Sequence, residues 1–458
     1  MKQRYSKILT KSVLPLGDRL TRQCVMQLYK FYSDSQWWSK EQLIEYQTQK
    51  LKETITIAYR DVKFYKELYD LHKIKVHELD TVEDLSRLPI ITKAELKEAY
   101  PDKCTRKTNM PWKEYFTSGS SGRPFAVRVD NLTMSHARAL MFIRASFSGW
   151  EIGMPLLQTG ITPIRGMLKS LKDFFLNVDY ASAFDLTNDA LDRSLEIISK
   201  KNLKYVMGFP GSIYYMAVRA EEIRFNHKLD GIVTWGDNLY RHYRQKIETV
   251  FGCKITDTYG CGEGIQVAAQ CGYSNGAYHI FMPHVVVEVV DDDGFPVKRG
   301  EPGNIVLTRL DAGAMPLIRY NIGDVSRLHT EEKCSCGRGL KMLYSIDGRD
   351  TDAIISPNGN RLIVHFFTGI FEYYPSIENF FIFQDKSGAI MVEIVPRSDF
   401  RIGHWHNIKR EILEKGDADL QLEMKLVRET SNISPNSKRR FVLSEYSKES
   451  TTDRLLIA

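Results

Sequence analysis

The segment Thr117-Ser118-Gly119-Ser120-Ser121-Gly122 interleaves hydroxyl side chains with glycines. Backbone N–H groups and hydroxyls in such a turn can surround the oxygens of a polyphosphate. The turn lacks the Gly-Lys-Ser/Thr ending of a Walker A loop, and the residues that follow, 125–129, alternate as a half-buried strand does. The pattern disfavours a P-loop NTPase. It predicts a phosphate-binding turn inside a β-hairpin, with a plain surface loop as the alternative.

A second group of reactive side chains lies in the segment from Asp257 to Glu263, after the strand-like Lys254-Ile255. The ring of Tyr259 could stack on a base, Gly260 would allow a tight turn, and Glu263 could hold a hard cation such as Mg²⁺ through oxygen. Alone, the segment also fits a short turn with a buried tyrosine. It is followed in order by the motif-like segments 316–324, which ends in Asp324, and 346–352, which contains Arg349.

Three cysteines and one histidine have the ligand types of a metal site. Cys271 and His279 flank a glycine-containing loop, and Cys334 and Cys336 follow later in a Cys-Ser-Cys-Gly run. Three thiolates and one imidazole suit a closed, tetrahedral structural zinc site. Buried free cysteines are the alternative, because Cys-x-Cys is tighter than the more usual Cys-x-x-Cys.

Composition excludes several function classes. The 63 basic and 57 acidic residues leave a small excess of +6, and no run of Lys and Arg interleaved with aromatics points to nucleic acid. No window resembles a secretory signal or a transmembrane helix, and the seven cysteines do not form the framework of a small secreted domain. We therefore expect a cytoplasmic protein with reduced or metal-bound thiols.

The elements that must position these residues are of mixed type. Residues 36–100 have helical spacing, with Thr92 as an N-cap, and residues 115–310 alternate strands and helices. Residues 285–290 and 304–310 read as paired strands, and an amphipathic helix is expected over 405–414. At 458 residues the chain exceeds a single core. We predict an α/β fold: a large multilayered domain over residues 1–348, with a helical N-terminal segment and a β-rich subdomain, and a small α+β domain over 349–458.

Taken together, these motifs resemble the adenylate-forming superfamily of acid ligases. The Ser/Gly loop, Tyr-Gly-x-x-Glu, Arg-Tyr-x-x-Gly-Asp and Gly-Arg-x-x-Asp occur in that order. Pro-Leu-Ile-Arg-Tyr and Cys-Ser-Cys-Gly-Arg are similar to the phenylacetate-coenzyme A ligase branch and its CapK-type capsule-biosynthesis relatives, in which such zinc clusters occur. The resemblance covers residues from about Tyr115 to Ser444.

The resemblance implies roles for individual residues. Thr117 to Gly122 would wrap the ATP phosphates, Tyr259 would lie against adenine, Glu263 would bind Mg²⁺, and Asp324 with Arg349 would take the ribose hydroxyls. Gly236 and Asp237 match a segment that borders adenine in relatives, although Asp stands where relatives have Glu.

Attack of a carboxylate on the α-phosphate of ATP also needs a cation near the phosphates. The resemblance assigns that role to Lys438, with Ser437 in place of the usual Gly; a basic surface turn is the alternative. In relatives the small domain rotates between two half-reactions. The hinge would lie among Asp350, Thr351 and Asp352.

The implied function is ATP-dependent, AMP-forming activation of a carboxylic acid, with transfer of the acyl group to coenzyme A or to an amine. The capsule-type resemblance favours a role in surface polysaccharide biosynthesis. Phe209, Trp235 and Ile265 flank the motifs and are acyl-pocket or core residues. The rival hypotheses are a non-catalytic nucleotide-binding scaffold and a zinc-dependent hydrolase, and the sequence does not indicate an oligomeric state.

Overall fold

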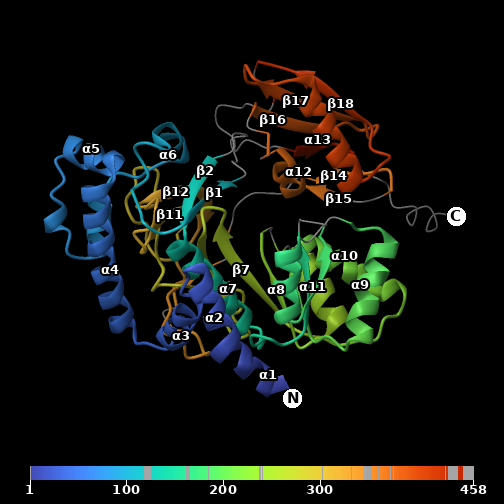
Figure 1. The fold of residues 1–458 in the computed structure, drawn as a ribbon, viewed down its shortest axis with the longest axis horizontal. Coiled ribbons are helices and arrows are strands. Elements are labelled where there is room, and N and C mark those ends of the chain that lie inside the picture. The colour runs from blue at the N-terminus through green and yellow to red at the C-terminus, as the bar shows by residue number, and fades with distance from the viewer. Residues whose placement is uncertain are drawn as a thin grey trace.

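The computed structural model describes residues 2–117, 125–160, 166–183, 185–236, 239, 241–301, 303–331, 333–344, 346, 353–358, 361–371, 373–374, 376–428, 430–431 and 442–446. Within these ranges the chain forms a large α/β part and a smaller group of C-terminal strands and helices, coloured orange to red in Figure 1. The mixed α/β fold expected from the sequence is confirmed.

The largest sheet is mixed, and its strand order is β13-β9-β8-β7-β6-β5-β3-β4. The strands are β3 (Leu156–Gly160), β4 (Val178–Ser182), β5 (Tyr205–Gly208), β6 (Gly231–Thr234), β7 (Ile255–Cys261), β8 (Ile265–Gln270), β9 (Tyr278–Ile280) and β13 (Met342–Leu343). Strands β3 to β7 pair in parallel, whereas β7–β8, β8–β9 and β9–β13 pair antiparallel. Strand β7 is therefore where the parallel half meets the antiparallel half.

Helices cover both faces of the parallel half, which explains its continuous apolar strands. Val206 and Ile232 pack with α9, α10 and α11, while Met207 and Val233 pack with Leu9 and Ala145 on the other face. Helix α7 (Asn131–Ser146) precedes β3, and the helices between the strands of this half are α8 (Met167–Phe175), α9 (Asn188–Lys200), α10 (Pro210–Glu222) and α11 (Arg241–Phe251). Successive side chains along each short strand therefore pack into two different cores, one on each face of the sheet.

The N-terminal region is helical, as its spacing predicts. It comprises α1 (Lys2–Ile8), η1 (Leu9–Val13), α2 (Leu14–Thr21), α3 (Val25–Ser35), α4 (Lys40–Asp61), α5 (Lys63–Leu71), η2 (Val76–Glu78), η3 (Glu83–Arg87) and α6 (Lys93–Ala99). Thr92 caps α6 in a capping box with Glu95, as predicted. Among the helices that the structure describes, none is long and apolar enough to cross a membrane.

Two smaller β units flank the large sheet. Strands β1 (Trp112–Thr117) and β2 (Phe125–Asp130) pair antiparallel on either side of the Ser/Gly segment, as a hairpin requires. Strands β10 (Val285–Val290), β11 (Gly303–Arg309) and β12 (Tyr320–Ser326) form an antiparallel sheet, which confirms the predicted pairing of 285–290 with 304–310. Apolar residues of β2, β8, β10, β11 and α4 to α6 share one core.

The C-terminal strands and helices are β14 (Ala353–Ile355), β15 (Arg361–Ile363), α12 (Val364–Phe371), β16 (Ile377–Gln384), β17 (Ile390–Pro396), α13 (Ile402–Lys415), β18 (Leu422–Leu426) and β19 (Val442–Ser444). Four of them form a sheet in the order β18-β17-β16-β19. Helix α13 contains the predicted amphipathic helix. The core of this group also includes Ala183 and Phe209 of the large part. The domain boundary at residues 348 and 349 stays a prediction.

Candidate active site and metal centre

The turn that carries Glu263 connects β7 to β8. Strand β7 continues through Cys261, so Tyr259 and Gly260 are strand residues and only 262–264 form the turn. This differs from the expectation of one short turn from Asp257 onward. The β7–β8 pairing has an irregularity between Tyr259 and Gly260, and a Cβ on Gly260 would lie 2.8 Å from the carbonyl oxygen of Ile265. Glycine therefore lets the two strands close on each other beside the turn.

The Glu263 side chain is buried and has two polar partners from other parts of the chain. The hydroxyl of Tyr320 donates to Glu263 Oε1 at 2.9 Å, and Lys93 Nζ lies 3.4 Å from the same oxygen. Burial raises the pKa of this carboxyl group. The Lys93 charge and hydrogen bonds from Cys261 and Tyr320 outweigh burial, so the pKa lies below its usual value. Glu263 is thus an ionised carboxylate at neutral pH, which is the form that binds Mg²⁺.

Backbone pairing explains how Lys93 reaches this carboxylate. Ile91 bridges to β12: its N–H donates to the carbonyl of Arg319 at 2.8 Å, and the N–H of Asn321 donates back to the carbonyl of Ile91 at 2.9 Å. Helix α6 begins two residues later, so its first residue, Lys93, lies beside Tyr320. The Lys93 ammonium also lies 5.7 Å from the ring centroid of Phe125, the first described residue after the Ser/Gly segment. The exit of the predicted phosphate loop therefore lies near Glu263.

Tyr259 and Asp324 are held together by a direct hydrogen bond. The Tyr259 hydroxyl donates to Asp324 Oδ2 at 2.8 Å, which joins β7 to β12. The family resemblance implies that Tyr259 lies against adenine and that Asp324 binds ribose. The structure brings these two residues together, and it brings Glu263 close to Tyr320, four residues before Asp324.

A buried ion pair, Arg309 with Asp311, contacts the backbone of the Glu263 turn. Arg309 Nε donates to Asp311 Oδ1 at 2.8 Å, and Arg309 Nη1 donates to the carbonyl of Glu263 at 3.3 Å. Thr133 Oγ1 also donates to Asp311 Oδ1, at 3.1 Å. Arg309 therefore links the turn to a network of buried charge.

The residues predicted to line an acyl pocket fall into two groups. Phe209 and Trp235 follow the carboxyl ends of β5 and β6, and Gly236, with a φ of +82°, lies against the Phe209 ring. Ligands of parallel α/β sheets usually bind at this edge. Ile265 is instead fully buried in the core shared by β2 and β10. The structure therefore groups Phe209 with Trp235 and separates Ile265 from them.

Several predicted site residues lie outside the described residues: Ser118, Gly119, Ser120, Ser121, Gly122, Asp237, Arg349 and Lys438, together with the hinge residues 350–352. For Thr117 the structure describes only the backbone, at the end of β1. Sequence reasoning missed Lys93, Tyr320, Arg309 and Asp311 as site residues. Tyr320 belongs to the Arg-Tyr-x-x-Gly-Asp motif and Lys93 follows the predicted N-cap Thr92, but neither position indicates by itself a contact with Glu263.

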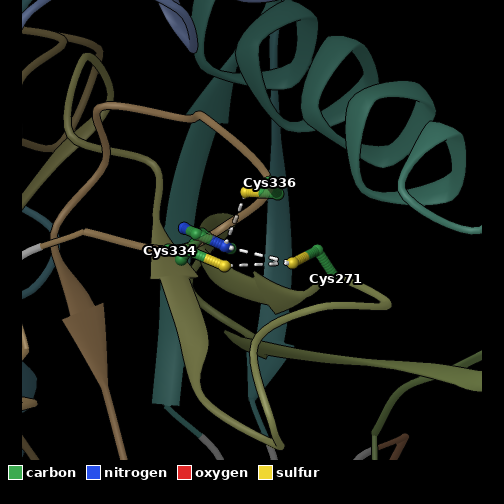
Figure 2. Close-up of side chains that lie close together, drawn as sticks. Cys271, Cys334 and Cys336 are labelled. Carbon is green, nitrogen blue, oxygen red and sulfur yellow. Dashed lines mark hydrogen bonds between the residues drawn. The ribbon is translucent and has the colours of Figure 1, made fainter.

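The four predicted zinc ligands come together at the other end of β8 from Glu263. Cys271 follows β8, His279 is in β9, and Cys334 and Cys336 lie in the loop before β13 (Figure 2). Cys271 Sγ is 3.7 Å from Cys334 Sγ and 3.3 Å from His279 Nε2, and Cys336 Sγ is 3.5 Å from that nitrogen. The four ligand atoms lie within 4.8 Å of one another.

These separations fit a tetrahedral ion. Zinc bonds of about 2.3 Å to sulfur and about 2.0 Å to nitrogen separate tetrahedral ligands by about 3.5 to 3.8 Å. Burial raises the pKa of the Cys336 thiol, but hydrogen bonds with His279 and Arg338 outweigh it and lower the pKa to about 5. Burial raises the pKa of Cys334 to about 12, and a bound cation would deprotonate this thiol as well. With four protein ligands, the cluster suits a structural ion.

The chain is similar to several known proteins. A family model described as "AMP-binding enzyme" matches residues 177–311. Phenylacetate-coenzyme A ligase of Thermus thermophilus is 28% identical over 330 residues, which are 69% of this chain and 72% of the relative. The Escherichia coli enzyme of the same name is 25% identical over 333 residues, with 69% and 73% covered.

Among solved structures, the chain resembles 2-hydroxyisobutyryl-CoA ligase in two states. One is a complex with 2-HIB-AMP and CoA in the thioesterification state, with a TM-score of 0.60 and 17% identity. The other is the postadenylation state with R3-HIB-AMP, with a TM-score of 0.58 and 18% identity. Each comparison covers 90% of this chain and 93% of the other. At this identity the likeness shows the fold.

Proposed function

Because this chain belongs to the adenylate-forming superfamily and resembles its phenylacetate-coenzyme A ligase branch, we propose that it is an AMP-forming acid ligase. In the first step a substrate carboxylate oxygen attacks the α-phosphate of ATP, the bond to pyrophosphate breaks, and an acyl adenylate forms. In the second step a nucleophile attacks the acyl carbon and AMP leaves with the former carboxylate oxygen. Coenzyme A is the acceptor that the matched ligases support.

The observation that carries the proposal is the convergence around Glu263. A buried, ionised carboxylate lies beside Lys93 and Tyr320, next to the strand that leaves the Ser/Gly segment. The Tyr259–Asp324 hydrogen bond joins β7, which ends at the Glu263 turn, to β12, which contains Tyr320. Such an arrangement supports a shared site for a divalent cation, phosphates and a nucleoside, because a purely structural turn would not require it.

The residues of this site fit Mg²⁺, since Glu263 is an oxygen ligand in its ionised form. The ion would offset the negative charge of the triphosphate during attack by a second anion. We propose that Glu263 holds it, that Tyr259 lies against adenine, and that Asp324 with Arg349 binds the ribose hydroxyls. Replacing Glu263 with Gln should raise the Mg²⁺ concentration needed for half-maximal adenylation by at least about tenfold, and an unchanged titration would remove Glu263 from the site.

We further propose that Thr117 to Gly122 wrap the phosphates and that Lys438 supplies the cation at the α-phosphate. Lys438→Ala should abolish adenylation and leave thioester formation from a pre-made adenylate largely intact. Arg439→Ala, which removes the neighbouring charge, is the matched control and should keep both half-reactions. If both half-reactions survive in Lys438→Ala, the assignment is wrong.

A pyrophosphate-release screen with a panel of carboxylic acids tests the function as a whole. Release that depends on one class of acid, followed by thioester formation with coenzyme A, is the expected result. Tight ATP binding without release for any acid would favour the rival hypothesis of a non-catalytic nucleotide-binding scaffold. An amine acceptor and a role in surface polysaccharide biosynthesis stay predictions from the capsule-type resemblance, and the same screen with amines tests the first of these.

We also propose that Cys271, His279, Cys334 and Cys336 bind a structural zinc ion. The geometry supports this assignment, and strand β8, which spans about 17 Å, lies between the cluster and the turn of Glu263. A zinc-dependent hydrolase is disfavoured because four protein ligands leave no open position for water. Since the reaction consumes ATP and the ligands must be reduced thiols, we place the protein in the cytoplasm.

A further inference from the structure

Large apolar side chains project to solvent from two helical segments. In the first, from α1 through α2, Ile8 is 56% exposed, Leu16 is 58% exposed and Leu20 is 78% exposed. In the second, α8, Met167 is 83% exposed and Phe174 is 73% exposed, and Leu171 is also exposed. Single exposed apolar residues are common on protein surfaces, whereas contiguous exposed apolar patches are typical of interaction sites.

The two segments are neighbours in the fold (Figure 1). The hydroxyl of Tyr5 in α1 donates to the carbonyl of Phe175 at the end of α8, at 2.7 Å. Leu9 of η1 and Leu176, which follows α8, also belong to the same buried cluster. The two segments are therefore in contact, and we call their exposed residues together the α2/α8 surface.

The charge that the α2/α8 surface presents is positive. Six basic residues are exposed on it: Lys7, Lys11, Arg19, Arg22, Lys169 and Lys172. Residues 2–22 and 166–177 contain two acidic side chains, of which one is partly buried and the other buried. Asp18 accepts a hydrogen bond from the N–H of Met26 at 2.8 Å, and Asp173 is buried. This local excess contrasts with the near balance of charge over the whole chain.

We propose that the α2/α8 surface binds the anionic surface of a phospholipid bilayer. Helices that alternate Lys and Arg with bulky apolar residues are typical of interfacial segments, whose apolar side chains enter the lipid while the cations meet the headgroups. The centres of protein–protein interfaces, by contrast, are depleted in lysine. The α2/α8 surface would thus hold the protein at a membrane surface. This inference is independent of the proposed function.

Vesicle flotation of the full chain tests the proposal directly. Wild-type protein should partition onto vesicles of phosphatidylcholine and phosphatidylglycerol at least about tenfold more than onto phosphatidylcholine alone, and the difference should shrink as salt is added. Leu20→Ser with Phe174→Ser, and separately Lys7→Glu with Lys11→Glu, should each lower the partition by at least about tenfold.

The matched control is Leu71→Ser with Tyr373→Ser. These residues are 76% and 70% exposed but lie outside the surface, so the control should bind as wild type does. Equal thermal midpoints for all variants would show that the fold is intact. Equal binding to both vesicle types, or wild-type binding by both test variants, would overturn the proposal. So would a dimer in sedimentation experiments that only the Leu20/Phe174 variant dissociates, without vesicle binding, because the surface would then hold a second copy.

Discussion

Lys93 Nζ lies 3.4 Å from Glu263 Oε1, although the two residues are 170 positions apart in the sequence. The contact depends on the backbone bridge between Ile91 and β12, which fixes the first turn of α6 beside Tyr320. Burial alone would raise the pKa of Glu263, and the Lys93 charge is the largest opposing influence. The pair therefore keeps the carboxylate ionised in a buried position.

Replacing Lys93 with Met should make the site sensitive to acid. Without the ammonium the pKa of Glu263 rises, so protonation begins at a higher pH, and the acid limb of kcat/KM moves toward neutral pH. The Mg²⁺ requirement at neutral pH should rise by about tenfold. Lys66→Met, which removes a lysine paired with Asp70 on the surface of α5, is the control. An acid limb at the wild-type position would show that Lys93 does not act on Glu263.

The lowered pKa of Glu263 also makes the stability of the fold depend on pH. Because the folded-state pKa of Glu263 is lowered, ionisation of this group stabilises the fold above its unfolded-state pKa of about 4.3, and this contribution is lost as pH falls through the folded-state pKa. Lys93→Met should reduce the contribution, so the variant should unfold at a higher pH during acid titration than the Lys66→Met control.

Two substitutions of Tyr259 should distinguish the effect of its ring from the effect of its hydroxyl. Tyr259→Ala removes the surface proposed to stack on adenine and should raise the KM for ATP by about tenfold or more. Tyr259→Phe keeps the ring and removes only the donor to Asp324, so it should have a smaller effect. If the Phe variant loses as much ATP affinity as the Ala variant, Tyr259 acts by positioning Asp324, and the stacking assignment is wrong.

Removal of the buried Arg309 charge should destabilise the fold. Arg309→Met leaves Asp311 buried without its counter-charge and should lower the free energy of unfolding by about 3 to 5 kcal/mol. Arg309→Met combined with Asp311→Leu removes both charges and should recover part of the loss, as measured by urea unfolding. A double variant with the summed loss of the two single variants would show that the two residues do not stabilise the fold as a pair.

Removal of one zinc ligand should affect folding more than chemistry. Cys334→Ser should reduce the bound zinc from one equivalent and lower the free energy of unfolding by about 3 kcal/mol or more. At a temperature where the variant is folded, its turnover should be close to that of the wild type. Cys253→Ser, outside the cluster, should keep both metal and stability. A wild-type protein without zinc, or a chelator that stops turnover without destabilising the protein, would contradict a structural role.

The sequence was sufficient to predict features that depend on local rules. The Thr92 capping box, the amphipathic helix α13 and the β10–β11 pair follow from capping chemistry, apolar spacing and turn residues. The four residues of the Cys/His cluster were identified by residue type, because thiols and imidazoles near glycines are few.

Contacts between distant elements were not predictable in this way. Lys93 was interpreted only as a helix start, and the Arg309–Asp311 pair was not noticed, because nothing in local periodicity tells which charges meet in a core. Strand β7 extends further than expected because Gly260 permits close pairing with β8. Ile265 is apolar beside a motif, like Phe209, but only the packing shows that it belongs to another core.

Oxygen transfer tests the central claim most directly. The carboxylic acid that gives the fastest pyrophosphate release would be labelled with ¹⁸O in its carboxylate and turned over with ATP, Mg²⁺ and coenzyme A. An acyl adenylate requires one labelled oxygen to leave with the α-phosphate, so the account predicts ¹⁸O in AMP and none in pyrophosphate. Label in inorganic phosphate with formation of ADP, or unlabelled AMP, would contradict it.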